Sequence, residues 1–112
     1  MVAHYLRRRV EFLEGLVPPP GPVLDAGCGT GLLLWQLRRL GYEVTGIDPS
    51  AGMLRQASPE VAARLAQASA ADLPFGDGAF PLVVSGATMH HLGDRALVAA
   101  SIREMVRVTA PG

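Results

Sequence analysis

A glycine-rich loop follows a short apolar run near the start of the chain. The run Val23–Ala26 has the sequence Val-Leu-Asp-Ala, and glycine then occupies alternate positions at Gly27, Gly29 and Gly31. Alternating glycines allow the backbone to turn sharply from a buried strand into a helix, and they let a ligand approach the main chain. The first turn of the helix supplies N–H groups that have no partner inside the helix. The loop therefore predicts either a ligand-binding turn or a tight structural turn.

Two classes of cofactor bind to loops of this kind. A dinucleotide site requires the spacing G-x-G-x-x-G, and Leu32 occupies the third glycine position. Asp25 stands just before the loop, where its negative charge would repel a pyrophosphate. S-adenosylmethionine (SAM) carries an ammonium and a sulfonium against one carboxylate, so an acidic neighbour favours it. The pattern Asp25-x-Gly27-x-Gly29-x-Gly31 resembles motif I of class I SAM-dependent methyltransferases.

A second carboxylate, Asp48, follows the next apolar run, Glu43–Ile47. A ribose presents two neighbouring hydroxyl donors, and one ionised carboxylate can accept hydrogen bonds from both. In a doubly wound fold, the carboxyl end of the second strand brings such a group to the ligand. The segment Asp48–Pro49–Ser50 resembles the acidic ribose-binding segment of the methyltransferase family. Two alternatives stay open, because Asp48 would equally suit the ribose of NAD or could cap a helix that starts near Ser50.

A third segment, Ala68–Phe75, is similar to the family's G-D-A-x-x-L-P-F. The resemblance implies an adenine contact there, with Ser69 where the family has an aspartate and Ala70 at the next position. A serine hydroxyl accepts a hydrogen bond without charge, so we expect weaker cofactor binding. Asp72 is a competing acceptor or a solvent-facing loop residue. Met53 falls where the family lays a side chain against the adenine, although a core methionine is the alternative.

The segment Phe80–Ser85 resembles the family's F-D-x-V-x-S, with proline at the aspartate position. The resemblance implies that Ser85 and Gly86 meet the methionine ammonium through the main chain. His90 and His91 lie in a short segment like the family's L-H-H-L. They are candidates for proton transfer, for lining the cofactor or for plain packing, and no other catalytic residue is indicated.

Residues 103–112 look like the family's R-E-x-x-R-V-L-x-P-G-G, or are an ordinary helix end. Together these segments cover residues 22–112 in the family's order. The resemblance implies SAM as cofactor and a small-molecule methyl acceptor, as in methyltransferases of the ubiquinone-biosynthesis type. The implied cofactor-binding residues are Asp25, Gly27, Cys28, Gly29, Gly31, Asp48, Pro49, Met53, Ser69, Ala70, Ser85 and Gly86.

The elements that must position these residues alternate between strands and helices. An amphipathic helix is expected over residues 1–17, and prolines connect it to a core over residues 22–112. About four strands alternate with helices, which predicts a parallel α/β sheet. The fold class is a Rossmann-like, partial doubly wound sheet in the strand order 3-2-1-4 with flanking helices. The expected strands are 23–26, 43–47, 63–68 and 82–85, and the expected core helices begin near residues 33, 50 and 94, the last with Val98, Ile102 and Met105 on its inner face.

Composition narrows the classes of function. The formal net charge of the 112-residue chain is zero, so no long-range field attracts nucleic acid or an anionic membrane. The Arg7–Arg9 cluster and His4 are expected on a solvated helix face. Cys28 is the one cysteine, which excludes an internal disulfide and a metal-binding cysteine cluster. No apolar run reaches the roughly 18 residues that would span a membrane. A cytoplasmic protein without metal is expected.

The end of the sequence falls at the turn that precedes a fifth strand in the family. A single, incomplete SAM-binding domain over residues 1–112 would leave the fourth strand as an uncovered edge, and exposed edges pair with other chains. We therefore expect a homodimer, or association of another segment with this edge. Whether the chain is an active enzyme stays open. The alternatives are a truncated, non-catalytic SAM-binding module or assembly partner, and a nicotinamide-dependent dehydrogenase.

Overall fold

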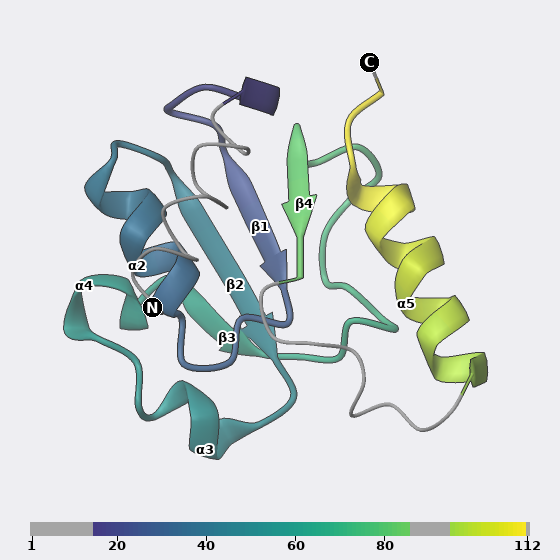
Figure 1. The fold of residues 1–112 in the computed structure, drawn as a ribbon. Helices are drawn as coiled ribbons and strands as arrows, with labels where there is room; N and C mark the ends of the chain where they lie inside the picture. The colour runs from purple at the N-terminus through teal and green to yellow at the C-terminus, as the bar shows by residue number, and fades with distance from the viewer. Residues whose placement is uncertain (1–14, 86–94, 112) are drawn as a thin grey trace.

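The computed structural model describes residues 15–85 and 95–111, which contain four strands interspersed with helices (Figure 1). The N-terminal helix predicted over residues 1–17 lies outside the described residues, except for its last positions, of which 15 and 16 are helical. The elements are β1 (Val23–Ala26), α2 (Leu32–Arg39), β2 (Val44–Asp48), α3 (Ala51–Leu54), α4 (Pro59–Ala62), β3 (Leu65–Gln67), β4 (Leu82–Val84) and α5 (Arg95–Val108).

The strands form one parallel sheet in the order β3-β2-β1-β4, which confirms the predicted topology. β1 pairs with β2 on one side and with β4 on the other, so that Asp25 lies opposite both Gly46 and Val84. All four residues of β1 are buried. A parallel strand that is covered on both faces is mostly apolar, without the alternation of a half-exposed strand. This explains the apolar residues of Val23–Ala26, among which Asp25 is the exception.

Helices cover the two faces of the sheet through two separate hydrophobic clusters. Val23 and Val44 point to the face covered by α2 and α4, where they pack with Leu34 and Val61. Neighbouring strand residues such as Leu24 point to the opposite face, where they pack with the loop before β4 and with α5. The result is a three-layer arrangement, with α2 and α5 on opposite sides of the sheet (Figure 1).

The short elements after β2 differ from the sequence-based expectation. One helix was expected from Ser50 to Ala57, but α3 ends at Leu54 and a further helix, α4, begins at Pro59. Ser50 caps α3, as expected, by accepting the N–H of Met53 at 3.2 Å. Pro59 does not merely interrupt the chain, because its fixed φ and missing N–H suit the first turn of α4, which Ser58 caps.

One predicted core position on α5 is wrong. Ile102 was expected on the inner face with Val98 and Met105, but its side chain is 51% exposed. Ser101 is buried in its place, because its hydroxyl donates to the carbonyl of Leu97 within the helix at 2.9 Å and so costs little on burial. Met105 does pack against the cluster that contains Leu24 and Val108. The face of α5 that contacts the sheet is therefore narrower than the sequence predicted.

The segment after α5 lies alongside the residues that lead into β4. Phe80 donates to the carbonyl of Val108 at 2.9 Å, and its own carbonyl accepts the N–H of Ala110 at 2.7 Å. Phe80 and Thr109 thus form a parallel bridge. Within the part of the chain that the structure describes, β4 itself pairs with β1 alone.

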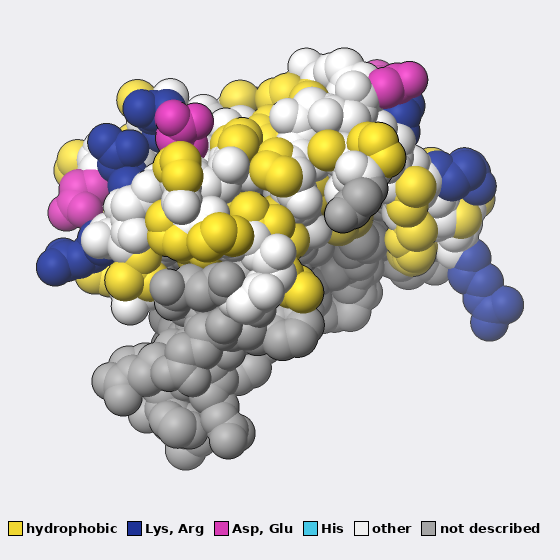
Figure 2. Space-filling model, turned by 90° about the horizontal axis from the view of Figure 1, so that it is seen from above, with side chains coloured by type: hydrophobic (Ala, Val, Ile, Leu, Met, Phe, Trp, Pro, Cys, Tyr) yellow, Lys and Arg dark blue, Asp and Glu magenta, His cyan; other side chains and the backbone are white. Residues whose placement is uncertain are grey.

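Charged side chains of both signs lie on the face at the amino ends of the strands, and neither sign dominates it. Figure 2 views the molecule from this end and shows hydrophobic side chains over its middle, with Arg, Asp and Glu side chains toward its rims. No helix within residues 15–85 and 95–111 combines the length and the apolar character that crossing a bilayer requires.

Candidate functional site

The predicted site residues gather where the parallel strands end. β1, β2 and β3 all run in the same direction, so the loops that follow them emerge at one edge of the sheet (Figure 1). We call Gly27–Gly31, Asp48–Met53 and Ala68–Asp72 the carboxyl-edge loops. Most of the residues that sequence analysis assigned to the cofactor lie in them.

The glycine loop has the backbone geometry that its sequence predicted. Gly27, Gly29 and Gly31 have φ angles of 141°, 57° and 79°, a region that residues with a side chain rarely adopt. Gly31 is also the N-cap of α2. A Cβ at Gly31 would lie 3.2 Å from Leu65 and 3.3 Å from Val61, so the loop packs tightly against β3 and α4. The turn is preformed without side-chain bulk.

Asp48 ties the end of β2 to the glycine loop. Its Oδ2 accepts the N–H of Gly29 at 2.9 Å, and its Oδ1 accepts the N–H of Ser50 at 2.8 Å. The residue is 7% exposed. A carboxylate offers about four lone-pair positions, so each oxygen retains capacity for one further donor. Because Ser50 itself caps α3, the helix-capping alternative for Asp48 does not apply.

Asp25 lies deeper than Asp48, within β1 and with no exposed surface. Its effect on the surroundings is visible at Cys28, the next buried group in the loop. Burial, together with the negative charges of Asp25 and Asp48, raises the pKa of the Cys28 thiol to about 12. The thiol therefore stays protonated near neutral pH, and the region around the glycine loop favours positive over negative charge.

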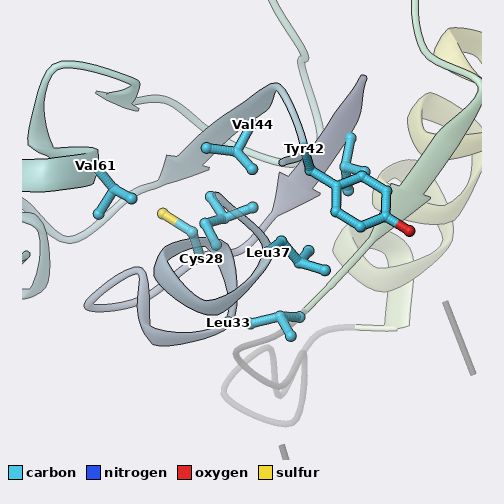
Figure 3. Packing of buried hydrophobic residues seen from close by; sticks show 8 residues of the cluster. Cys28, Leu33, Leu37, Tyr42, Val44 and Val61 are labelled. Atoms are coloured by element: carbon cyan, nitrogen blue, oxygen red, sulfur yellow. The ribbon is translucent and has the colours of Figure 1, made fainter. Parts of the chain in front are cut away.

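The Cys28 side chain belongs to the hydrophobic cluster under α2, as Figure 3 shows together with Leu33, Leu37 and Val61. Its N–H donates to the carbonyl of Ile47 at 2.9 Å, and its carbonyl accepts the N–H of Gly31. The structure does not bring this side chain to the surface of the carboxyl-edge loops. Cys28 supports the loop from below.

The predicted adenine segment lies beside Asp48. The N–H of Ala68 donates to the carbonyl of Asp48 at 3.2 Å, and Ser69 follows it as an exposed residue. The Ser69 hydroxyl accepts the N–H of Ala71 at 3.1 Å, and Ala70 is half-buried. Met53, on α3, is 40% exposed, so the core alternative for it is not realised.

A pair of charged residues on α5 holds the next part of this segment, and sequence analysis did not assign it a role. Glu104 Oε1 accepts the N–H of Leu73 at 2.9 Å. Arg107 donates to the carbonyls of Leu73 and Phe75 at 3.0 and 2.8 Å, and it binds Glu104 through Nε at 2.6 Å. The signal was present in the sequence as opposite charges spaced i, i+3, but residues 103–112 were interpreted only as a family-like segment or an ordinary helix end.

Several predicted residues fall outside this geometry. The described residues do not include Gly86, His90, His91, His4, the Arg7–Arg9 cluster or Asp94, near which the last helix was expected to begin. Ser85 is half-buried and directly follows β4, at the same edge as the carboxyl-edge loops. Among the described residues, no cluster of three His, Cys, Asp or Glu side chains is arranged to hold a metal ion.

The charged side chains of the carboxyl-edge loops suit a cationic nucleoside. The loops 27–31, 48–53 and 68–72 contain Asp48 and Asp72 but no arginine or lysine. The carboxylates of these loops would repel a phosphate group and attract a sulfonium and an ammonium, although the guanidinium of Arg55, just beyond the loop 48–53, lies near Gly52. Asp48 offers the paired oxygens that adjacent hydroxyls require.

Comparison with known proteins agrees with this geometry. The model of a family described as "Methyltransferase domain" matches residues 23–112. A 2-methyl-6-phytyl-1,4-hydroquinone methyltransferase from Synechocystis is 32% identical, over 96% of this chain and 37% of its own length. A malonyl-acyl-carrier-protein O-methyltransferase from Erwinia billingiae is 40% identical, over 80% of this chain and 35% of its own length. The chain thus spans less than half the length of these relatives.

Solved structures show the same fold. The structure of a SAM-dependent methyltransferase from Methanosarcina mazei superposes with a TM-score of 0.80 at 30% identity, and the match covers 90% of this chain and 53% of that one. The YcgJ protein of Bacillus gives a TM-score of 0.80 at 27% identity and covers 96% of this chain.

Proposed function

The chain belongs to the methyltransferase domain family, and from this membership we propose that it binds SAM and transfers its methyl group to a small-molecule acceptor. SAM is the cofactor that the family and its SAM-dependent neighbours support. One observation carries the proposal. Asp48, at the carboxyl end of β2, is bound to the glycine loop and keeps lone pairs on both oxygens, in a set of loops without a basic side chain.

In this proposal each part of the carboxyl edge has one task. Asp48 accepts the ribose hydroxyls, with Pro49 beside it, and the glycine loop (Gly27, Gly29 and Gly31) gives the cofactor access to the main chain. Met53, Ser69 and Ala70 surround the base, while Ser85 and Gly86 receive the amino-acid end. The negative charges of Asp25 and Asp48 favour a cationic ligand. Bound SAM supplies an already activated methyl group, so the chain mainly has to orient the acceptor and exclude water.

The experiment that tests the function is a SAM titration followed by a turnover assay. The acceptor panel contains hydroquinones and quinones, because the relatives include one methyltransferase named for a hydroquinone and one named for demethylmenaquinone. We expect saturable SAM binding and methyl transfer to at least one acceptor. SAM binding without turnover on the whole panel would instead support a non-catalytic SAM-binding module. If turnover occurs, its pH dependence in the wild type and in His90→Gln and His91→Gln variants would show whether either histidine acts as a base.

Replacement of Ser69 by aspartate is expected to tighten SAM binding by about tenfold, the gain from a charge-assisted hydrogen bond to the adenine amino group. Ser69 is exposed at the end of β3, so the added carboxylate meets no packed side chain. Calorimetric titration of the Ser69→Asp variant and the wild type measures the change. The Ser69→Asn variant is the matched control, since it has similar size without charge. Equal affinity for SAM in all three proteins would show that Ser69 does not contact the adenine.

We further propose that the free side of β4 associates with another chain, as a homodimer in the simplest case. The support is that β4 pairs with β1 alone among the described residues, and a strand edge offers unpaired N–H and C=O groups. Analytical ultracentrifugation is expected to show a concentration-dependent dimer. A monomer over the whole micromolar range would contradict this association.

The remaining partners and the location of the protein follow from charge and cysteine content. The net charge of zero gives no general attraction to nucleic acid or to anionic membranes, so we propose neither as a partner. The proposed compartment is the cytoplasm, because a single buried thiol needs no oxidising environment.

A further inference from the structure

The turn Ser69–Asp72 is attached to the rest of the molecule at both of its ends. Before the turn, the N–H of Ala68 is bound to the carbonyl of Asp48. After the turn, the side chain of Leu73 is 3% exposed and packs in the cluster that contains Ala26 and Ile47. The position of the turn therefore depends on how firmly Leu73 is held.

Both backbone groups of Leu73 are held by α5. Its N–H donates to Glu104 Oε1 at 2.9 Å, and its carbonyl accepts from Arg107 Nη2 at 3.0 Å. Arg107 Nη1 reaches further along the same loop, to the carbonyl of Phe75 at 2.8 Å and to Asp77 at 2.9 Å. The planar guanidinium can make these bonds together only because its donors point in fixed, divergent directions.

Glu104 and Arg107 also fix each other. Arg107 Nε lies 2.6 Å from Glu104 Oε2, and Nη2 lies 3.0 Å from Oε1, which is a bidentate arrangement. The bonds from Arg107 and from the Leu73 N–H lower the pKa of Glu104, so the carboxylate stays ionised at neutral pH. Two charged side chains of α5 are thus engaged with one loop while they remain partly exposed, 33% for Arg107 and 19% for Glu104.

We propose that Glu104 and Arg107 are positioning residues of the cofactor site, which hold the Ser69–Asp72 turn against the adenine through Leu73 and Phe75. This inference rests on the proposed SAM site. It assigns base recognition to residues of α5 that do not touch the cofactor. Loss of the Arg107 bonds would leave the sheet intact and would loosen one end of the turn, so its effect should be specific to the base.

The test compares affinity for S-adenosylhomocysteine and for S-inosylhomocysteine, which differ at the adenine amino group. The variants are Arg107→Gln, Arg107→Lys and Glu104→Gln. Arg103→Gln is the matched control, because it removes the same charge from an exposed position on α5. In Arg107→Gln we expect about tenfold weaker binding of the adenine ligand and a smaller preference for adenine over hypoxanthine. Arg107→Lys should restore part of the preference, and Arg103→Gln should not change it.

Hydrogen exchange at the Leu73 amide reports whether the turn has been released. Faster exchange with an unchanged adenine preference would overturn the positioning role, as would a wild-type protein that binds both ligands equally. If Arg107→Gln does not fold, Glu104→Gln decides by the same two measurements, since it keeps one acceptor oxygen for the Leu73 N–H but loses the charge and the second acceptor that bind Arg107. Absence of any S-adenosylhomocysteine binding in the wild type would instead refute the proposed function.

Discussion

Replacement of Asp48 by alanine is expected to weaken SAM binding at least about 100-fold. The carboxylate is proposed to accept two ribose hydroxyls, and a hydrogen bond to a charged group contributes about 1.5–3 kcal/mol. Asp48 also accepts the N–H of Gly29, so its loss frees the glycine loop at the point where it approaches the ligand. Both effects weaken binding in the same direction. Calorimetric titration with SAM measures the change.

Two further variants separate the causes. Asp48→Asn keeps one acceptor oxygen but no charge, so it should retain part of the loop tether and bind SAM with intermediate affinity. Glu43→Ala is the matched control, because Glu43 is exposed immediately before the same strand, at the end remote from the site. It should bind SAM as the wild type does. A folded Asp48→Ala protein with wild-type affinity would exclude Asp48 from the ribose site.

The largest effect on stability is expected from Gly46→Ala in the middle of β2. A Cβ at this position would lie 2.6 Å from Leu34 Cδ1, 2.7 Å from Leu65 Cδ2 and 3.0 Å from the Cβ of Cys28. Gly46 needs no unusual backbone conformation, so the cost comes from overpacking alone. Overpacking of a core by one methyl group costs about 1–3 kcal/mol. In a domain of this size, we expect the midpoint of thermal unfolding to fall by about 10 °C.

Gly76→Ala provides the control for this effect. A Cβ at Gly76 would have no neighbour within 4 Å, so the substitution should leave the midpoint nearly unchanged. The added methyl group would also press against Cys28, which belongs to the glycine loop. Gly46→Ala should therefore also weaken SAM binding. An unfolding midpoint equal to that of the wild type would show that α2 can move away from the sheet, contrary to the packing described here.

The sheet was predictable because local patterns and chain connectivity determine it. Val23–Ala26 is apolar and enters a glycine loop, and Val44–Ile47 is apolar and ends at an acidic residue, which are strong signals for buried parallel strands. The strand order followed from right-handed crossovers together with the family resemblance. The position of Asp48 beside the loop was predictable for the same reason, since parallel strands end at one edge.

Features that depend on tertiary packing were not predictable. The helical spacing of Val98, Ile102 and Met105 gave no way to know how narrow the contact between α5 and the sheet is, and Ile102 proved to be exposed. The sequence places Cys28 in the loop but does not reveal that its side chain points into the cluster under α2. The contact between Arg107 and the Leu73 carbonyl joins residues that are far apart along the chain.

The most direct test of the account compares the binding of a sulfonium nucleoside with the binding of a phosphate-bearing nucleoside. Calorimetric titration of the wild-type protein with SAM and, separately, with NADH compares the two ligands at the same carboxyl-edge loops. Because these loops combine glycines with carboxylates and contain no basic side chain, we expect saturable binding of SAM and no detectable binding of NADH. Binding of NADH in preference to SAM would contradict the account.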